Sequence, residues 1–137
     1  MSDAPTGNGP FDLSTNFAHL GVGATAVPEP AFDGMAWYQG YGERHASDGA
    51  EARLVSLHTF SEPWGMWEMH PRGAELVLVT AGRLTLIQEQ DGVEQRIELS
   101  AGQYAINPPG TWHTADASAP ATAVFITAGV GTQHRPR

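Results

Sequence analysis

The stretch EMHPRGAE, residues 68–75, decides how the rest of the chain is interpreted. Side chains two positions apart on a strand share one face, so Glu68 and His70 point the same way if this stretch is extended. A Pro-Arg-Gly turn follows, and Glu75 opens the next apolar run. His113 comes much later, just after a second Pro/Gly turn at 108–110. Two imidazoles and two carboxylates that converge inside a β-structure would form a site for a divalent transition metal.

The spacing around Glu75 resembles the first motif of the cupin family, G(X)5HXH(X)3,4E(X)6G. The matching residues are Gly65, Glu68, His70, Glu75 and Gly82. Two departures stand out, because a carboxylate replaces the first histidine of HXH, and the gap between the glycine and that position is two residues instead of five.

A second stretch is similar to the other cupin motif, G(X)5PXG(X)2H. It contains Gly102, Pro108, Gly110 and His113 with matching spacing. The asparagine that the motif has four residues after this histidine is Ala117 here. Together, the two motifs cover residues 65–117, and they are more specific for fold than for reaction.

The resemblance implies a single all-β domain over residues 13–128, with the double-stranded β-helix of a cupin, a jelly-roll-like barrel. It also implies metal ligands at the motif positions, namely Glu68, His70, Glu75 and His113. Dioxygenases, isomerases, lyases and cyclases all occur among cupins, and members often pair as dimers, so we expect a homodimer.

Composition narrows the function classes. The chain has 137 residues, which is the size of one domain. Its net charge of −8, from 15 acidic and 7 basic residues, argues against nucleic-acid binding. No apolar run approaches the length of about 20 residues that crosses a membrane. The first residues lack the basic and apolar regions of a signal peptide, so we expect a cytoplasmic protein. Without cysteine, any metal needs histidine and carboxylate ligands, and this points away from structural zinc.

Short strands separated by turns predict a barrel or sandwich with no helix. A disordered arm is expected at 1–12, a polar loop at 43–50 and a mobile tail at 129–137. Asp91-Gly92 predicts a two-residue hairpin, because both of its turn positions need positive φ. The strands are expected at 13–20, 35–38, 53–60, 76–79, 84–90, 93–99, 104–106, 111–115 and 121–128, and residues 27–30 are expected to be extended because of their prolines.

The candidate ligands combine two histidines, His70 and His113, with the carboxylate of Glu75. This set leaves coordination positions open for water, oxygen or substrate. Glu68 would be a fourth ligand, a general base beside the ion, or a group that orients a ligand histidine. Iron(II), manganese, nickel, cobalt and zinc all suit such a site.

Aromatic residues near the motifs indicate a partly apolar pocket. Its candidate lining residues are Trp64, Tyr104, His58, Tyr38 and Phe125. Trp67 alternates with Glu68 and should face away from the metal. The remaining histidines, at positions 19, 45 and 134, lie in polar or terminal stretches and are expected to be exposed. Arg53 or Arg72 could pair with a substrate carboxylate.

Two functions from different classes fit these observations. The first is a divalent-metal-dependent enzyme that acts on a small organic molecule, with Glu68 as the candidate catalytic residue. The alternative is a cupin that binds or senses a small molecule without catalysis. A third reading is a cupin whose site has degenerated and whose value is structural.

Overall fold

Two antiparallel β-sheets account for most of the fold, which is known from a computed structural model that describes residues 3–137. The chain order of the elements is β1 (Asn16–Gly21), η1 (Val22–Ala24), β2 (Thr25–Ala31), α1 (Ala36–Arg44), η2 (Ala46–Glu51), β3 (Arg53–Phe60), β4 (Met66–Met69), β5 (Glu75–Ala81), β6 (Arg83–Gln90), β7 (Val93–Ser100), β8 (Tyr104–Asn107), β9 (Trp112–Asp116), β10 (Ala121–Thr127) and β11 (Gln133–Pro136). One sheet has the strand order β2-β1-β3-β10-β5-β8, and the other has the order β11-β4-β9-β6-β7. The all-β prediction is confirmed.

The hairpin between β6 and β7 forms at the predicted turn. Asp91 has φ of 53° and Gly92 has φ of 75°. Gln90 pairs with Val93 across the turn, and the antiparallel register continues to the pair Arg83 and Ser100. The Asp-Gly dipeptide therefore supplies the two positive φ angles that this tight connection needs.

The main core lies between the two sheets and follows the period of two along each strand. Val77 and Val79 of β5 are fully buried, and Leu84 and Leu86 of β6 are at most 1% exposed. Phe125 of β10 closes this cluster. Burying a side chain of this kind stabilises a fold by about 1.5–3 kcal/mol.

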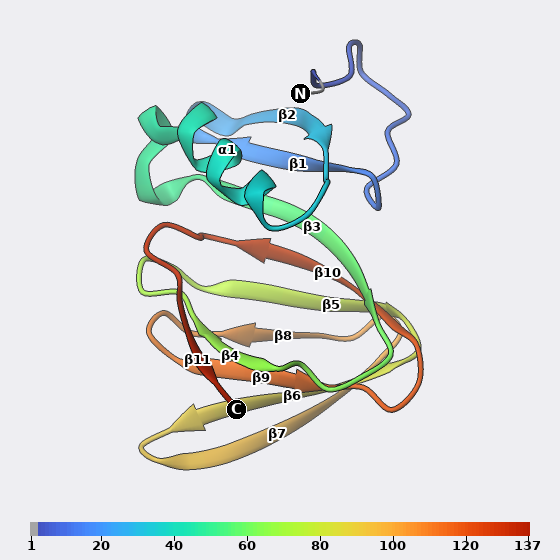
Figure 1. The fold of residues 1–137 in the computed structure, drawn as a ribbon, viewed down its shortest axis with the longest axis vertical. Coiled ribbons are helices and arrows are strands. Elements are labelled where there is room, and N and C mark those ends of the chain that lie inside the picture. Colours follow the sequence, from blue (N-terminus) through green and yellow to red (C-terminus); the bar gives the residue numbers. More distant parts are fainter. Residues whose placement is uncertain (1–2) are drawn as a thin grey trace.

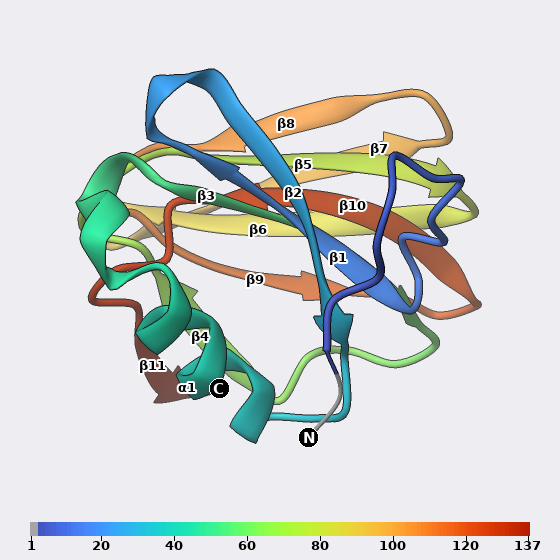
Figure 2. The same cartoon turned by 90° about the horizontal axis from the view of Figure 1, so that it is seen from above.

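Helix α1 and the β1–β2 hairpin sit together at one end of the molecule, next to β3 (Figure 1). The view from above shows α1 to the side of that hairpin (Figure 2). The prediction of a strand at 35–38 and of no helix is therefore wrong. Trp37 is the one buried residue of α1, and its ring meets Phe17 edge-on at 5.3 Å between centroids. One buried aromatic side chain produces no helical period in the sequence, so tertiary packing decided this element.

The C-terminal segment differs from the mobile tail that the sequence predicted. Residues Gln133–Pro136 form β11, antiparallel to β4, so His134 pairs with Glu68 and Arg135 with Trp67. The Arg135 guanidinium lies 5.1 Å from the Trp67 ring and 4.5 Å from the Trp112 ring, and it also pairs with Glu89. These cation–π contacts hold the strand, and no pattern in a segment of four residues predicts them.

The N-terminal arm contains no helix or strand over residues 3–12. Residues 1 and 2 of the predicted arm lie outside the described residues. The domain boundaries at 12/13 and 128/129 remain predictions. Within residues 3–137, no helix has the length and apolar character that crossing a membrane requires.

Candidate metal centre

His70 follows directly after β4 and is 4% exposed. Its Nδ1 lies 2.7 Å from the Thr132 hydroxyl, which donates its own proton to the Gly129 carbonyl at 2.9 Å. A hydroxyl has one proton, so Thr132 must accept a hydrogen bond from Nδ1–H of His70. This contact fixes the tautomer of the neutral ring and leaves a lone pair on Nε2.

His113 lies on β9 and is 1% exposed. Its Nδ1 donates to the Thr111 carbonyl at 3.1 Å, so the neutral ring again carries its lone pair on Nε2. Within residues 3–137, the Nε2 atoms of His70 and His113 are both buried and have no hydrogen-bond partner. Two buried lone pairs of fixed tautomer are the arrangement that imidazole ligands of a metal adopt.

Glu75, the first residue of β5, lies between the two imidazoles and is 4% exposed. Its Oε1 is 3.2 Å from Nε2 of His113, and its Oε2 is 3.3 Å from Nε2 of His70. The carboxylate also accepts hydrogen bonds from Asn107 at 3.0 Å and from Thr127 at 2.6 Å. These two donors hold the carboxylate in one orientation, and each oxygen keeps a further lone pair for an ion.

The three groups shift one another's protonation. Burial would raise the pKa of Glu75, but the His113 and His70 rings outweigh it and lower the pKa below 4.5. Burial would lower the pKa of His113, but the Glu75 carboxylate outweighs it and raises the pKa above 6.5. Without an ion, the pair therefore favours an ionised carboxylate beside a protonated imidazole.

The donor set fits a divalent ion. Adjacent donors of an octahedral ion bonded at about 2.1 Å lie about 3.0 Å apart. The distances of 3.2 and 3.3 Å from Glu75 to the two Nε2 atoms are close to this value. Small side-chain adjustments would bring all three groups onto one ion.

Glu68 stands at the edge of this group and points toward it from β4. Its Oε2 lies 3.8 Å from Nε2 of His70, and its Oε1 lies 3.5 Å from Nε2 of His134. Ligand atoms of Glu68, His70 and His113 all lie within 4.8 Å of one another. The Glu68 side chain is 31% exposed, so it connects the buried histidines with the surface.

A cavity of about 470 Å³ opens beside the three site residues Glu68, His70 and Glu75. Four of the residues predicted for a substrate pocket line it, namely Trp64, Tyr38, His58 and Phe125, and their role toward a substrate stays a prediction. Tyr104 does not line it, and that prediction is wrong. Its side chain is 61% exposed, because the alternation along β8 turns Ala105 and Asn107 inward instead.

Several residues near the site were not singled out by the sequence. Thr132, Thr127 and Asn107 hold the candidate ligands, and His134 lines the cavity beside Glu68. The Asn107 carbonyl oxygen in turn accepts a hydrogen bond from Gln88 at 2.9 Å. These polar residues come from separate strands and, for Thr132, from the segment before β11, and they have no common spacing. Only the alternation of buried positions along β8 could have indicated Asn107.

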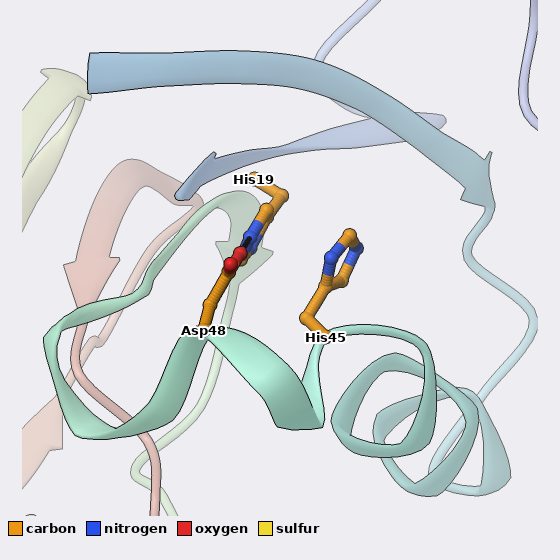
Figure 3. Close-up of side chains that lie close together, drawn as sticks. All are labelled: His19, His45 and Asp48. Atoms are coloured by element: carbon orange, nitrogen blue, oxygen red, sulfur yellow. Dashed lines mark hydrogen bonds and ion pairs between the residues drawn. The ribbon is translucent and has the colours of Figure 1, made fainter. Parts of the chain in front are cut away.

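A second group of possible ligand atoms consists of His19, His45 and Asp48 (Figure 3). Contrary to expectation His19 is buried, with 2% exposure, while His45 is half-buried and the His134 side chain is 43% exposed. His19 contacts Asp48 at 2.6 Å through Nε2 and the Tyr41 hydroxyl at 2.6 Å through Nδ1.

The imidazoles of His19 and His45 are stacked, with centroids 3.5 Å apart and an angle of 15° between their planes. Nearly parallel rings direct their lone pairs along parallel planes, so the lone pairs do not converge on an ion. His45 Nε2 instead contacts the buried Glu29 at 2.9 Å. The group is a hydrogen-bonded network that fastens α1 and η2 to β1.

Comparison with solved structures finds one chain with a similar fold and two with a weaker likeness. A conserved protein with a double-stranded β-helix domain from Klebsiella pneumoniae subsp. pneumoniae has a TM-score of 0.52 and 24% identity over 62% of this chain and 76% of that one. A cupin-2 domain containing protein from Shewanella frigidimarina has a TM-score of 0.47 and 24% identity over 62% and 71%. Hydroquinone 1,2-dioxygenase from Sphingomonas sp. TTNP3, with 4-hydroxybenzoate bound, has a TM-score of 0.47 and 19% identity over 55% and 59%. This chain thus spans less than two thirds of the dioxygenase chain.

The fold and the His/carboxylate group define a β-barrel protein of the double-stranded β-helix class. The cupin domain family matches residues 59–129, which is more than half of the chain. The chain therefore belongs to the cupin family, as the two motifs predicted. No curated protein matches it.

Proposed function

We propose that this cupin is a divalent-metal-dependent enzyme that acts on a small organic molecule in the cavity beside Glu68, His70 and Glu75. His70, His113 and Glu75 would hold the ion, and Glu68 would be the fourth ligand. The proposal is carried by one observation. The two buried Nε2 atoms have no hydrogen-bond partner within residues 3–137, and both face a carboxylate that other side chains hold in place.

The bound ion would supply Lewis acidity toward a substrate oxygen or the activation of dioxygen. Iron(II), manganese, nickel, cobalt and zinc all accept imidazole and carboxylate ligands. If Glu68 is not a ligand, its partly exposed carboxylate borders the cavity and would take a proton from a bound substrate. The apolar cavity wall keeps water away from the substrate and strengthens these interactions.

Metal binding is tested first, with protein stripped by a chelator and reloaded with single ions. An ion at 100 times its dissociation constant adds roughly 2.7 kcal/mol to the free energy of unfolding. For a domain of this size, the melting temperature should rise on the order of 10 °C. Calorimetry with the metal alone should give binding that His70→Ala and His113→Ala abolish. His58→Ala is the matched control, because His58 lines the same cavity away from the imidazole pair. The absence of a stability shift with every ion would refute the proposal.

The alternative is a cupin that binds or senses a small molecule without catalysis. The coordination sphere of the bound ion distinguishes it from the enzyme. An enzyme of this kind keeps a position open for substrate, so manganese-loaded protein should enhance the relaxation of water protons strongly. A manganese ion without exchangeable water would favour the binding module.

A further inference from the structure

The cavity has an acidic end and a largely apolar, aromatic wall. Glu68, His70 and Glu75 border one end. The rest of the wall includes Tyr38, Tyr41, Leu54, Phe60, Trp64 and Phe125. Ring centroids of Phe60, Trp64 and Phe125 lie 5.2–6.0 Å apart at inclined angles, which is the spacing of packed aromatic rings.

Among residues 3–137, no side chain with a permanent positive charge lines the wall. The chain contains no lysine, and none of its seven arginines lines the cavity. Three arginines are exposed, at positions 53, 72 and 83, so the predicted pairing of Arg53 or Arg72 with a substrate carboxylate has no support here. The other four form ion pairs with Glu29, Glu89 and Asp116, namely Arg44, Arg96, Arg135 and Arg137.

Two polar groups of the wall, Tyr38 and His58, are neutral at pH 7. Burial lowers the pKa of His58 and raises the pKa of Tyr38 to about 12, the latter with help from Glu68 and Glu75. Tyr38 and His58 contact each other at 3.4 Å and offer a hydrogen-bonding pair without charge.

A bound divalent ion would not change this balance. The carboxylates of Glu68 and Glu75 together carry two negative charges, and these offset the two positive charges of the ion. An anionic ligand would then enter a largely apolar wall that offers no arginine or lysine to pair with it, and burying an unpaired anion is costly.

We infer that the ligand of this cavity is an uncharged molecule with an apolar ring as its body and a hydroxyl or carbonyl oxygen at the end near His70. Carboxylates and phosphates are excluded. The orientation rests on the proposed function, since it places the oxygen beside the metal ligands. The preference for a neutral ring rests on the cavity wall alone. The volume of about 470 Å³ lies within the range of about 300–1,000 Å³ typical of small-molecule sites.

The test uses two ring compounds of the same shape and different charge. Benzamide is neutral and benzoate is an anion at neutral pH. Calorimetric titration of the full chain should give an affinity for benzamide at least 10-fold higher than for benzoate, in metal-free and metal-loaded protein alike. Acetamide, which has the same amide without the ring, should bind at least 10-fold more weakly than benzamide. Equal or tighter binding of benzoate, or equal binding of acetamide, would overturn the inference.

Variants locate the binding. Phe125→Leu should weaken benzamide binding several-fold, and Phe60→Leu, at a less buried position, serves the same purpose if the first variant does not fold. Tyr104→Ala is the matched control, because this exposed aromatic residue lies outside the cavity, and its affinity should stay unchanged. A loss at Tyr104 with none at the phenylalanines would place the ligand elsewhere and overturn the inference.

The same titrations separate the two proposals. If no ion binds but metal-free protein still prefers benzamide, the metal-dependent function fails and the ligand class stands. If ions bind at His70 and His113 but benzoate competes as well as benzamide, the ligand class fails and the metal centre stands.

Discussion

Thr132 accepts a hydrogen bond from His70 Nδ1 at 2.7 Å, across 62 positions of the chain. The hydroxyl proton is directed to the Gly129 carbonyl, so this threonine can only accept from the ring. The segment that leads into β11 thus sets the orientation and the tautomer of a buried imidazole. A partner of this kind also raises the basicity of a ligating histidine.

Replacing the hydroxyl tests this relationship. Thr132→Val keeps the side-chain volume but cannot accept the hydrogen bond, so metal affinity should fall roughly 10- to 100-fold. Thr132→Ser restores the acceptor and should keep most of the affinity. Calorimetric titration with metal is the measurement. Equal affinity in the valine variant and the original protein would show that Thr132 does not position His70.

Glu68 occupies the position at which the cupin motif has a histidine, and substitutions there separate its roles. If Glu68 is a ligand, Glu68→Gln should lower metal affinity substantially and Glu68→His should retain it. If it is a free base, both variants bind metal and turnover collapses. A loss of roughly 10- to 100-fold would instead indicate an orienting role. We expect the ligand outcome, and an anomalous scattering map with the carboxylate turned away from the ion would contradict it.

The pH dependence of the metal-free protein follows from the coupled shifts at His113 and Glu75. The pKa of His113 is raised, so its contribution to stability is present below 6.5 and is lost as pH rises through the folded-state pKa. The pKa of Glu75 is lowered, so its contribution is present above 4.5 and is lost as pH falls. Denaturant unfolding should therefore show that this pair stabilises most between about pH 4.5 and 6.5. His113→Gln should remove the loss of stability that occurs above about pH 6.5.

In contrast to the stability of the metal-free pair, the affinity for metal should increase as pH rises. Protons compete with the ion for the imidazole nitrogens, so metal affinity falls as pH drops through the raised pKa of His113. Titration of affinity from mildly alkaline to mildly acidic pH measures this. Constant affinity across that range would mean that His70 and His113 are not ligands.

Two glycines near the His19 network have opposite expected effects on substitution. A Cβ at Gly21 would lie 2.5 Å from Thr25 Oγ1 and 2.7 Å from Asp48 Oδ2. Gly21→Ala should therefore break the contact between His19 and Asp48 and lower the melting temperature. A Cβ at Gly42 in α1 meets nothing within 4 Å. Gly42→Ala should add about 0.5–1 kcal/mol through helix propensity. Thermal unfolding of both variants tests these two predictions. An unchanged melting temperature of Gly21→Ala would show that the side chains around His19 rearrange without loss of stability.

The sequence alone indicated the all-β class, most of the strands and the cupin family, because each rests on short-range patterns. Alternation along 93–99 and the Asp91-Gly92 turn are local properties of the backbone. The spacing of the two motifs pointed to His70, Glu75 and His113. In the structure, the Glu75 carboxylate lies within 3.3 Å of Nε2 of both histidines. Their role as ligands remains a proposal.

Only the tertiary structure decided the elements that depend on distant contacts. The segment that contains Trp37 is a helix because the Trp37 ring packs against Phe17, and no local period in the sequence encodes that contact. Strand β11 exists because Arg135 lies over Trp67 and Trp112 and because β4 offers an unpaired edge. The same pairing brings Thr132 and His134 to the site from the end of the chain. A sequence lists such residues without their neighbours, whereas the energy that orders them comes from contacts formed once both sheets are assembled.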